Sequence, residues 1–408
     1  MLMENTFFIK ELKLIPTEGS SLKQEWSLLR GGPIISYYEN IRTPAISMSL
    51  TFVDADGVVS NEGITGGEYI QMEVDFKELG VFKIDASKHR MMINSIGNVN
   101  TKSSRQTATL EAISVESIVN ETVRVSKKFD ATIDQSVRRL LVSEEKGIKT
   151  TKTLNSESVA NKYSFVGNQK RPMDIIQWLC PKASASGKSF GFLFFETLDG
   201  YTFKSIDTLF NQPVSQTYTK SEVSSNSDFR ILDDQVNKNT DVGLSMRMGM
   251  YANRTLYMNM KDSSREVVDF KISELQLEKP PRAPLGLDTK PTRLMFRMLD
   301  VGALQKDSKL TDVQNQQDLA KYQNRSYARN NLIFSQSINI MIPCNPNLRA
   351  GQTIEIKLPL PTSDQKSKRY GDGKKDISGK YLISELKHEI GNNRAYTQLS
   401  LIRNTFTA

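Results

Sequence analysis

The sequence predicts a mainly β protein with α+β peripheral parts, and three observations support this fold class. Alternating apolar and polar residues, which place one set of side chains on a core face, dominate residues 1–117. The same alternation returns after residue 332, in short segments separated by turn residues. Between these regions the apolar spacing becomes helical. Many short, evenly spaced strands at both ends are typical of small antiparallel barrels or sandwiches.

Strands account for most of residues 1–117. Ile46–Phe52 and Tyr69–Phe76 carry apolar residues at every second position. Between them, Asp54–Gly57 and Gly66–Gly67 supply residues that tolerate the positive φ of tight turns. Further strands are predicted at Val81–Ile84, Arg90–Ile93 and Thr107–Ile113. Together these segments predict a first closed β unit.

Helices are predicted in the region that follows. Apolar residues at helical spacing predict a helix over Asp130–Leu141, with Asp130 as its N-cap. Residues 143–162 are polar and rich in Ser, Thr and Lys, which predicts a loop. A second short helix is predicted over Met173–Leu179, begun by Pro172 and ended by Pro181.

A hairpin and a closing set of strands complete the expected elements. Phe190–Phe195 and Tyr201–Ile206 are joined by Asp199–Gly200, a dipeptide that suits the tight turn of a hairpin. From 214 to 310 the signals are weak and predict no topology. A capping-box pattern at Thr311–Gln314 begins a helix near 312–329. The closing strands are predicted within Ser337–Pro343, Asn345–Leu358, Gly379–His388 and Ala395–Arg403.

Composition narrows the class of protein. The chain has 408 residues, of which 38% are hydrophobic and 25% charged, so it is expected to fold into several compact units. Glu4 stands where a signal peptide needs basic residues, and no run approaches the roughly 20 apolar residues of a membrane span. We therefore expect neither a cleaved signal nor membrane insertion. Cys180 and Cys344 are expected to be buried free thiols, which favours assembly in a cytosol.

The net charge of +8 permits an acidic partner but does not require one, because acidic residues are interleaved along the chain. The densest basic stretch is Lys366–Lys375. It lies between two predicted strands and is rich in Gly, Asp and Ser, so a solvated loop is favoured over a phosphate-binding loop.

No residue is predicted to be catalytic, cofactor-binding or metal-binding. His89 and His388 lie in strand-like segments without an acid or thiol at motif spacing. Ser184–Ser189 departs from the phosphate-loop pattern, and Asp54–Val58 departs from the calcium-loop pattern at Val58. The acid pairs Asp233–Asp234 and Glu144–Glu145 are expected to be solvated. The aromatic residues of the predicted hairpin fit cross-strand packing better than a carbohydrate site.

Four stretches, in this order along the chain, resemble the baseplate hub protein of contractile-tailed (T-even-like) bacteriophages: Glu121–Phe129, Arg171–Leu179, Phe192–Phe203 and Gly379–Ile390. The resemblance implies two tail-tube-like antiparallel β-barrels within one chain, plus inserted peripheral domains. It implies these boundaries: a first tube-like barrel at 1–117; a peripheral α+β domain at 118–189 and 214–331; and a second tube-like barrel at 190–213 and 332–408.

The same resemblance implies a structural, non-enzymatic role. Three copies would form a homotrimer with a pseudo-sixfold ring that joins the tail tube to the threefold central spike. An axial channel would let DNA pass transiently. The implied partners are the central spike protein, the tail tube protein, baseplate wedge proteins and the tape-measure protein. The implied location is the tail baseplate of the virion, after assembly in the host cytoplasm.

Two alternatives of other classes stay open. One is a spike-associated hydrolase that degrades cell wall or polysaccharide. The other is a basic module that binds glycans or nucleic acid.

Overall fold

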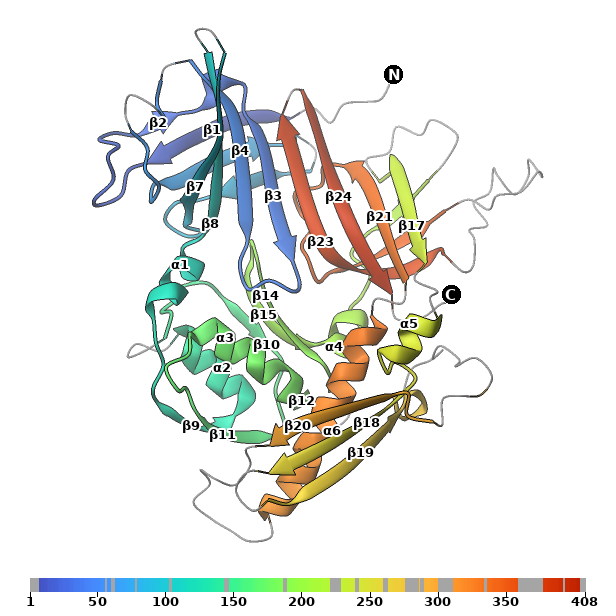
Figure 1. The fold of residues 1–408 in the computed structure, drawn as a ribbon. Coiled ribbons are helices and arrows are strands. Elements are labelled where there is room, and N and C mark those ends of the chain that lie inside the picture. The colour runs from blue at the N-terminus through green and yellow to red at the C-terminus, as the bar shows by residue number, and fades with distance from the viewer. Residues whose placement is uncertain are drawn as a thin grey trace, which may run out of the picture.

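The computed structural model describes the residues 7–55, 57–59, 63–77, 79–102, 105–142, 147–185, 189–220, 229–238, 242–259, 263–275, 286, 290–299, 311–333, 336–358, 377–391 and 393–403. Fourteen of the described strands form one sheet at one end of the molecule, and helices with smaller sheets occupy the other end (Figure 1). The mainly β fold class with α+β peripheral parts is therefore confirmed.

The N-terminal half of the large sheet contains eight strands. They are β1 (Phe8–Ile15), β2 (Trp26–Ser27), β3 (Ile34–Asn40), β4 (Ser47–Asp54), β5 (Tyr69–Asp75), β6 (Val81–Ile84), β7 (Met91–Lys102) and β8 (Arg105–Ser114). A 3-10 turn, η1 (Leu29–Gly31), separates β2 from β3. The strands predicted between residues 46 and 113 are confirmed.

The C-terminal half supplies the other six strands. They are β16 (Thr217–Thr219), β17 (Asp233–Lys238), β21 (Gln336–Pro343), β22 (Thr353–Lys357), β23 (Gly379–Gly391) and β24 (Arg394–Arg403). The four predicted closing strands are confirmed. The strand predicted within Asn345–Leu358 begins only at Thr353. β16 and β17 arise in the region where the sequence predicted no topology.

The two halves join edge to edge through β3 and β23, which pair antiparallel from Asn40–Glu385 to Ile35–Ile390. One apolar core runs beneath both, and it includes Tyr37 and Leu50 from one half and Leu386 and Leu401 from the other. The described ladders form an open path that ends at β2 and β17. An isolated parallel bridge joins Thr219, the last residue of β16, to Arg230, which lies shortly before β17. Closure into barrels stays a prediction.

The predicted hairpin is confirmed, but its turn residues differ from the expected ones. β14 (Phe192–Thr197) and β15 (Gly200–Ser205) form a three-stranded sheet with β10 (Leu154–Ser156), apart from the large sheet. The hairpin strands therefore do not pair with the described strands of the large sheet, and the assignment of residues 190–213 to the second barrel stays a prediction. Thr197 pairs with Gly200, so the turn residues are Leu198 and Asp199. β10 also places a strand inside the predicted loop 143–162.

Helices pack beside this hairpin. They are α1 (Val115–Thr122), α2 (Ile133–Val142) and α3 (Pro172–Leu179), followed by the 3-10 turn η2 (Cys180–Lys182). The expected N-cap is wrong, because Asp130 lies in β9 (Lys128–Thr132), which pairs with β11 (Lys162–Val166). The Asp130 carboxylate instead accepts a hydrogen bond from the Ser164 hydroxyl on that strand.

A further small sheet lies away from the large sheet (Figure 1). A three-stranded sheet contains β18 (Ala252–Asn259), β19 (Arg265–Lys271) and β20 (Arg293–Leu299), and α6 (Thr311–Leu332) packs against it. The predicted helix near 312–329 is confirmed. The smaller elements are β12 (Ser184–Ala185), β13 (Ser189–Phe190), α4 (Ile206–Phe210), α5 (Val242–Arg247) and η3 (Ile272–Glu274). No helix among the described residues is long and apolar enough to cross a membrane.

Candidate functional site

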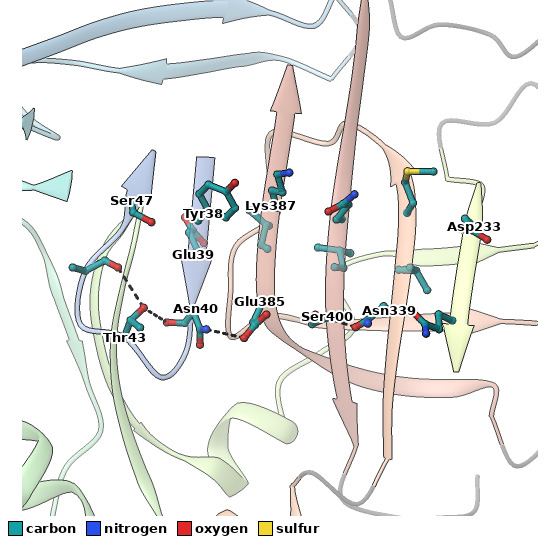
Figure 2. A pocket seen from close by; sticks show the side chains of 17 residues that line it. Tyr38, Glu39, Asn40, Thr43, Ser47, Asp233, Asn339, Glu385, Lys387 and Ser400 are labelled. Atoms are coloured by element: carbon teal, nitrogen blue, oxygen red, sulfur yellow. Dashed lines mark hydrogen bonds between the residues drawn. The ribbon is translucent and has the colours of Figure 1, made fainter. Parts of the chain in front are cut away.

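A cavity of about 620 Å³ lies over the large sheet where its two halves meet (Figure 2). Its lining comes from β3, β4, β17, β21, β23 and β24, so both halves of the chain contribute to it. A set of side chains on this side of β3, β4, β8, β17, β21, β23 and β24 is called the polar face below. They are Ser36, Tyr38, Asn40, Ser47, Ser49, Thr51, Thr109, Glu111, Asp233, Gln235, Asn339, Met341, Glu385, Lys387, Glu389, Arg394, Tyr396, Gln398 and Ser400.

The polar face follows from strand alternation. In β3 the residues Ile35, Tyr37 and Glu39 are buried, whereas Tyr38 is exposed on the opposite side. Side chains on neighbouring strands point to the same side when the residues pair directly. Asn40 pairs with Glu385 across the junction of the two halves. The polar face is therefore continuous from one half to the other.

Hydrogen bonds between strands hold these polar side chains in place. The Asn40 amide donates to Glu385 Oε1 at 2.8 Å, and the Ser400 hydroxyl donates to Asn339 Oδ1 at 3.0 Å (Figure 2). On the other side of the junction, the Ser49 hydroxyl donates to Glu111 Oε1 at 2.8 Å. Such cross-strand pairs occupy donors and acceptors that would otherwise be available to bind a ligand.

Lys387 occupies the middle of the face. Its ammonium lies 2.5 Å from Glu389 Oε2 and 5.7 Å from the centre of the Tyr38 ring. Burial opposes ionisation of Glu389, but hydrogen bonds from Lys387 and Tyr396 outweigh it and lower its pKa. Glu389 therefore keeps its negative charge and neutralises Lys387.

The charge of the polar face differs in sign from that of the whole chain. Its acidic members are Glu111, Asp233, Glu385 and Glu389, and its basic members are Lys387 and Arg394. The face is thus net negative, whereas the chain carries +8. A surface of this sign repels polyanions and does not retain them.

Directly beneath the face, Glu39 connects three parts of the molecule. It is 2% exposed and accepts hydrogen bonds from the Tyr37 hydroxyl at 2.8 Å, the Leu198 amide at 2.8 Å and the Ala350 amide at 2.7 Å. Leu198 is at the tip of the β14–β15 hairpin, and Ala350 precedes β22. Burial raises the pKa of Glu39 to about 7, although Arg349 and these donors oppose the shift.

The raised pKa predicts a pH-dependent contribution to stability. Since the folded state binds the Glu39 proton more tightly than the unfolded state, this contribution is complete below about pH 4.5 and is lost as the pH rises through 7. Between these values the free energy of unfolding of the wild type should fall by up to about 1.4 kcal/mol per pH unit more steeply than that of Glu39→Gln. Urea unfolding at pH 5, 6, 7 and 8 measures both slopes, and parallel slopes would contradict the prediction.

Of the two histidines, His388 is brought near another residue considered from the sequence: its Nδ1 lies 3.8 Å from Cys344 Sγ, and burial raises the pKa of that thiol to about 12. His388 is fully buried in β23, where its Nδ1 lies 2.8 Å from Thr397 Oγ1, and burial lowers its pKa to about 3. The prediction of a sheet histidine is confirmed for this residue. It is wrong for His89, which lies in the turn before β7 and accepts a hydrogen bond from the Asp85 amide. Cys180 and Cys344 are buried free thiols, as expected.

Of the acidic residues considered from the sequence, those that the structure describes lie in a strand and in a turn. Asp233 and Asp234 lie in β17 and not in a loop; Asp233 is exposed on the polar face, and Asp234 pairs with Lys220. Asp54 accepts hydrogen bonds from the amides of Val58 and Val59, which fits a turn. Glu144–Glu145 and Lys366–Lys375 lie outside the described residues. Among the described residues no group of three or more His, Cys, Asp or Glu side chains could hold a metal ion.

Strands flank the Ser184–Ser189 segment on both sides, in β12 and β13, where a phosphate loop would lead into a helix. The polar face was not identified from the sequence. Its signal is present in polar positions such as Ser47, Ser49 and Thr51, but alternation does not tell which polar side of a strand faces a shared cavity.

No family model matches the sequence, and no curated protein matches it. The fold is similar to that of the tail protein from Neisseria meningitidis MC58, with 10% sequence identity, a TM-score of 0.59 and 98% of each chain covered. It is also similar to the 43 kDa tail protein of prophage MuSo2 from Shewanella oneidensis, with 9% identity, a TM-score of 0.56, and 98% of this chain and 100% of that chain covered. The chain therefore has a fold like that of these two tail proteins along nearly its whole length.

Proposed function

We propose that the chain is a structural subunit of a phage-type tail, and more specifically the baseplate hub of a contractile tail. In this role it is a homotrimer that joins the tail tube to the threefold central spike within the virion. The similarity of fold to two tail proteins supports the broader assignment. The four sequence stretches that resemble baseplate hub proteins support the narrower one.

The observation that carries the proposal is the continuity of the polar face across β3 and β23. A chain with two joined sheet halves presents two modules, so three copies present six around an axis. Contacts between copies would cover the ends of the sheet at β2 and β17, which protects exposed strand edges from aggregation. The two modules would be the tube-like barrels, with the intervening residues as peripheral domains.

The polar face is the surface that would line the axial channel. Its net negative charge and its internal hydrogen bonds favour a channel that DNA crosses without being held. The tape-measure protein would occupy the same channel before DNA passes. The tail tube and the central spike would bind the two ends of the ring, and baseplate wedge proteins its outside.

In this role the protein is not an enzyme. Hydrolysis of cell wall or polysaccharide by paired acids requires two carboxyl groups across an accessible cleft. The buried acids Glu39, Glu116 and Glu196 are at most 2% exposed and are engaged by the protein's own donors. No specific observation favours the hydrolase or the basic binding module over the structural role.

Light scattering after size-exclusion chromatography tests the trimer, and negative-stain electron microscopy tests the ring. The full chain, alone and mixed with its spike protein, should give a species of three chain masses, seen as a ring with a central hole. Trimers should appear in at least one of the two samples. A monomer in both samples would contradict the proposal.

A further inference from the structure

We propose that the outer face of the β18–β19–β20 sheet binds an amphipathic helix of a partner protein, whose apolar strip is flanked by acidic side chains. This apolar face consists of Leu256, Met258, Val267, Leu294, Phe296 and Met298. It goes beyond the ring and channel, because it lies on a small sheet separate from the large sheet that carries the polar face (Figure 1).

Strand register brings these six residues together. Leu256 of β18 pairs with Val267 of β19 on one side and with Phe296 of β20 on the other. Met258 likewise pairs with Met298. Because directly paired residues share a side of the sheet, the residues form adjacent rows of one apolar surface.

The exposure of this surface is unusual for apolar residues. Phe296 is 74% exposed and Met298 is 73% exposed, and Leu294 and Val267 are each more than half exposed. Single exposed apolar residues are ordinary, but a contiguous group of this kind marks an interaction site. Aromatic and Met side chains are enriched at protein interfaces, where a central aromatic residue often contributes most of the binding energy.

The opposite face of the same sheet shows what kind of element fits. There Val268 and Leu299 pack in one core with Leu319 and Ala320 of α6. The Asn324 amide of that helix also donates to the Val268 carbonyl at 3.1 Å. Three strands about 4.8 Å apart span roughly 10 Å, the diameter of one helix. A second helix would complete a helix–sheet–helix sandwich.

Charge at the border of the apolar face selects the partner. Arg254 and Asp269 form a two-contact ion pair at 2.6 and 2.8 Å, and these two charges cancel. Arg265 and Lys271, both exposed on β19, add two positive charges on the same side. Acidic side chains beside the apolar strip of the partner would complement them, whereas basic side chains would be repelled.

The first test uses a fluorescent 18-residue helical peptide with a leucine strip flanked by glutamates, and the isolated full chain. We expect binding that weakens at least tenfold in Phe296→Ser and at least tenfold when lysines replace the glutamates. Val81→Ser is the matched control, because Val81 is 48% exposed on β6 of the large sheet, and it should bind like the wild type. Absence of binding, equal binding of the lysine peptide, or equal loss in the control would overturn the proposal.

The second test asks what covers the face in solution. A Met298→Cys variant introduces one accessible thiol, since Cys180 and Cys344 are buried. We expect rapid maleimide labelling of the free protein and protection by the glutamate peptide. Slow labelling at every protein concentration would mean that the chain covers its own face. Protection of the thiol from maleimide that grows with protein concentration would indicate that a second copy covers the face. Protection by anionic lipid vesicles but not by the peptide would indicate that a membrane covers it. Each of these three results would overturn the proposal.

Discussion

Replacement of Lys152 by methionine is expected to lower the free energy of unfolding by about 3–5 kcal/mol, because it leaves two carboxylates buried without a counter-charge. The Lys152 ammonium lies 2.7 Å from Glu116 Oε2 and 2.5 Å from Glu196 Oε1. The exposed fractions of the three side chains are 5%, 2% and 0% for Lys152, Glu116 and Glu196. Urea unfolding at pH 7.5, followed by tryptophan fluorescence, measures the loss.

Lys152, Glu116 and Glu196 form a buried triad, and its position in the fold gives the loss of Lys152 an effect beyond the free energy of unfolding. Glu116 belongs to α1 and Glu196 to β14, while the Ile46 amide just before β4 donates to Glu196 Oε2 at 3.1 Å. The triad therefore fastens the peripheral helices and hairpin to the large sheet. We expect the Lys152 variant to lose the contact between these parts before it loses the core of either one.

The pH dependence of the same variant gives an independent check. Burial raises the pKa of Glu196 in the folded protein, and Lys152 opposes that shift. Without Lys152, protonation of Glu196 relieves more of the penalty, so the deficit of the variant relative to the wild type should shrink as the pH falls from 7.5 to 5. A deficit that grows over this range would contradict the explanation.

Lys10→Met is the matched control. Lys10 lies 2.8 Å from Asp75, but the two side chains are 44% and 31% exposed. A solvent-exposed ion pair contributes little to stability, so Lys10→Met should lose far less than Lys152→Met. Equal losses for Lys10→Met and Lys152→Met would show that burial of the triad has no special effect.

Local patterns predicted most strands because alternation is a property of neighbouring residues. Tyr69–Phe76 and Gly379–His388 were identifiable on this basis, and both form strands of the large sheet. Which strands pair with each other is not a local property and could not be predicted in this way. The hairpin at Phe192–Ser205 was recognised, but its sheet partner Leu154–Ser156 is a three-residue strand in a polar region, too short to show a period.

The candidate site was beyond prediction for a related reason. The polar face depends on the pairing of Asn40 with Glu385, which are 345 residues apart. Glu39 offers no signal either, because its neighbours in sequence do not reveal that Leu198 and Ala350 supply its hydrogen-bond donors. Such sites are assembled by long-range topology, which a single sequence records only indirectly.

Reversal of charge on the polar face is expected to raise the affinity of the protein for DNA. Asp233→Lys combined with Glu385→Lys changes the face by four charge units per chain, on two strands that line the cavity. Each phosphate contact formed by a new lysine releases a counterion, so affinity depends steeply on salt. For duplex DNA at about 50 mM salt we expect at least a hundredfold tighter binding than the wild type. The slope of log affinity against log salt should steepen by about 0.9 per new phosphate contact.

A second double variant separates the effect of the face from that of total charge. Glu25 and Asp174 are 59% and 55% exposed and are not members of the polar face, so Glu25→Lys with Asp174→Lys adds the same charge elsewhere. Fluorescence anisotropy with a labelled duplex, over a salt series, compares the two double variants. If the polar face lines a channel for DNA, its variant should gain affinity far beyond the control, because lysines on a hollow surface act on one duplex together. Equal gains in both variants would mean that binding follows net charge alone, and the polar face would then have no special relation to DNA.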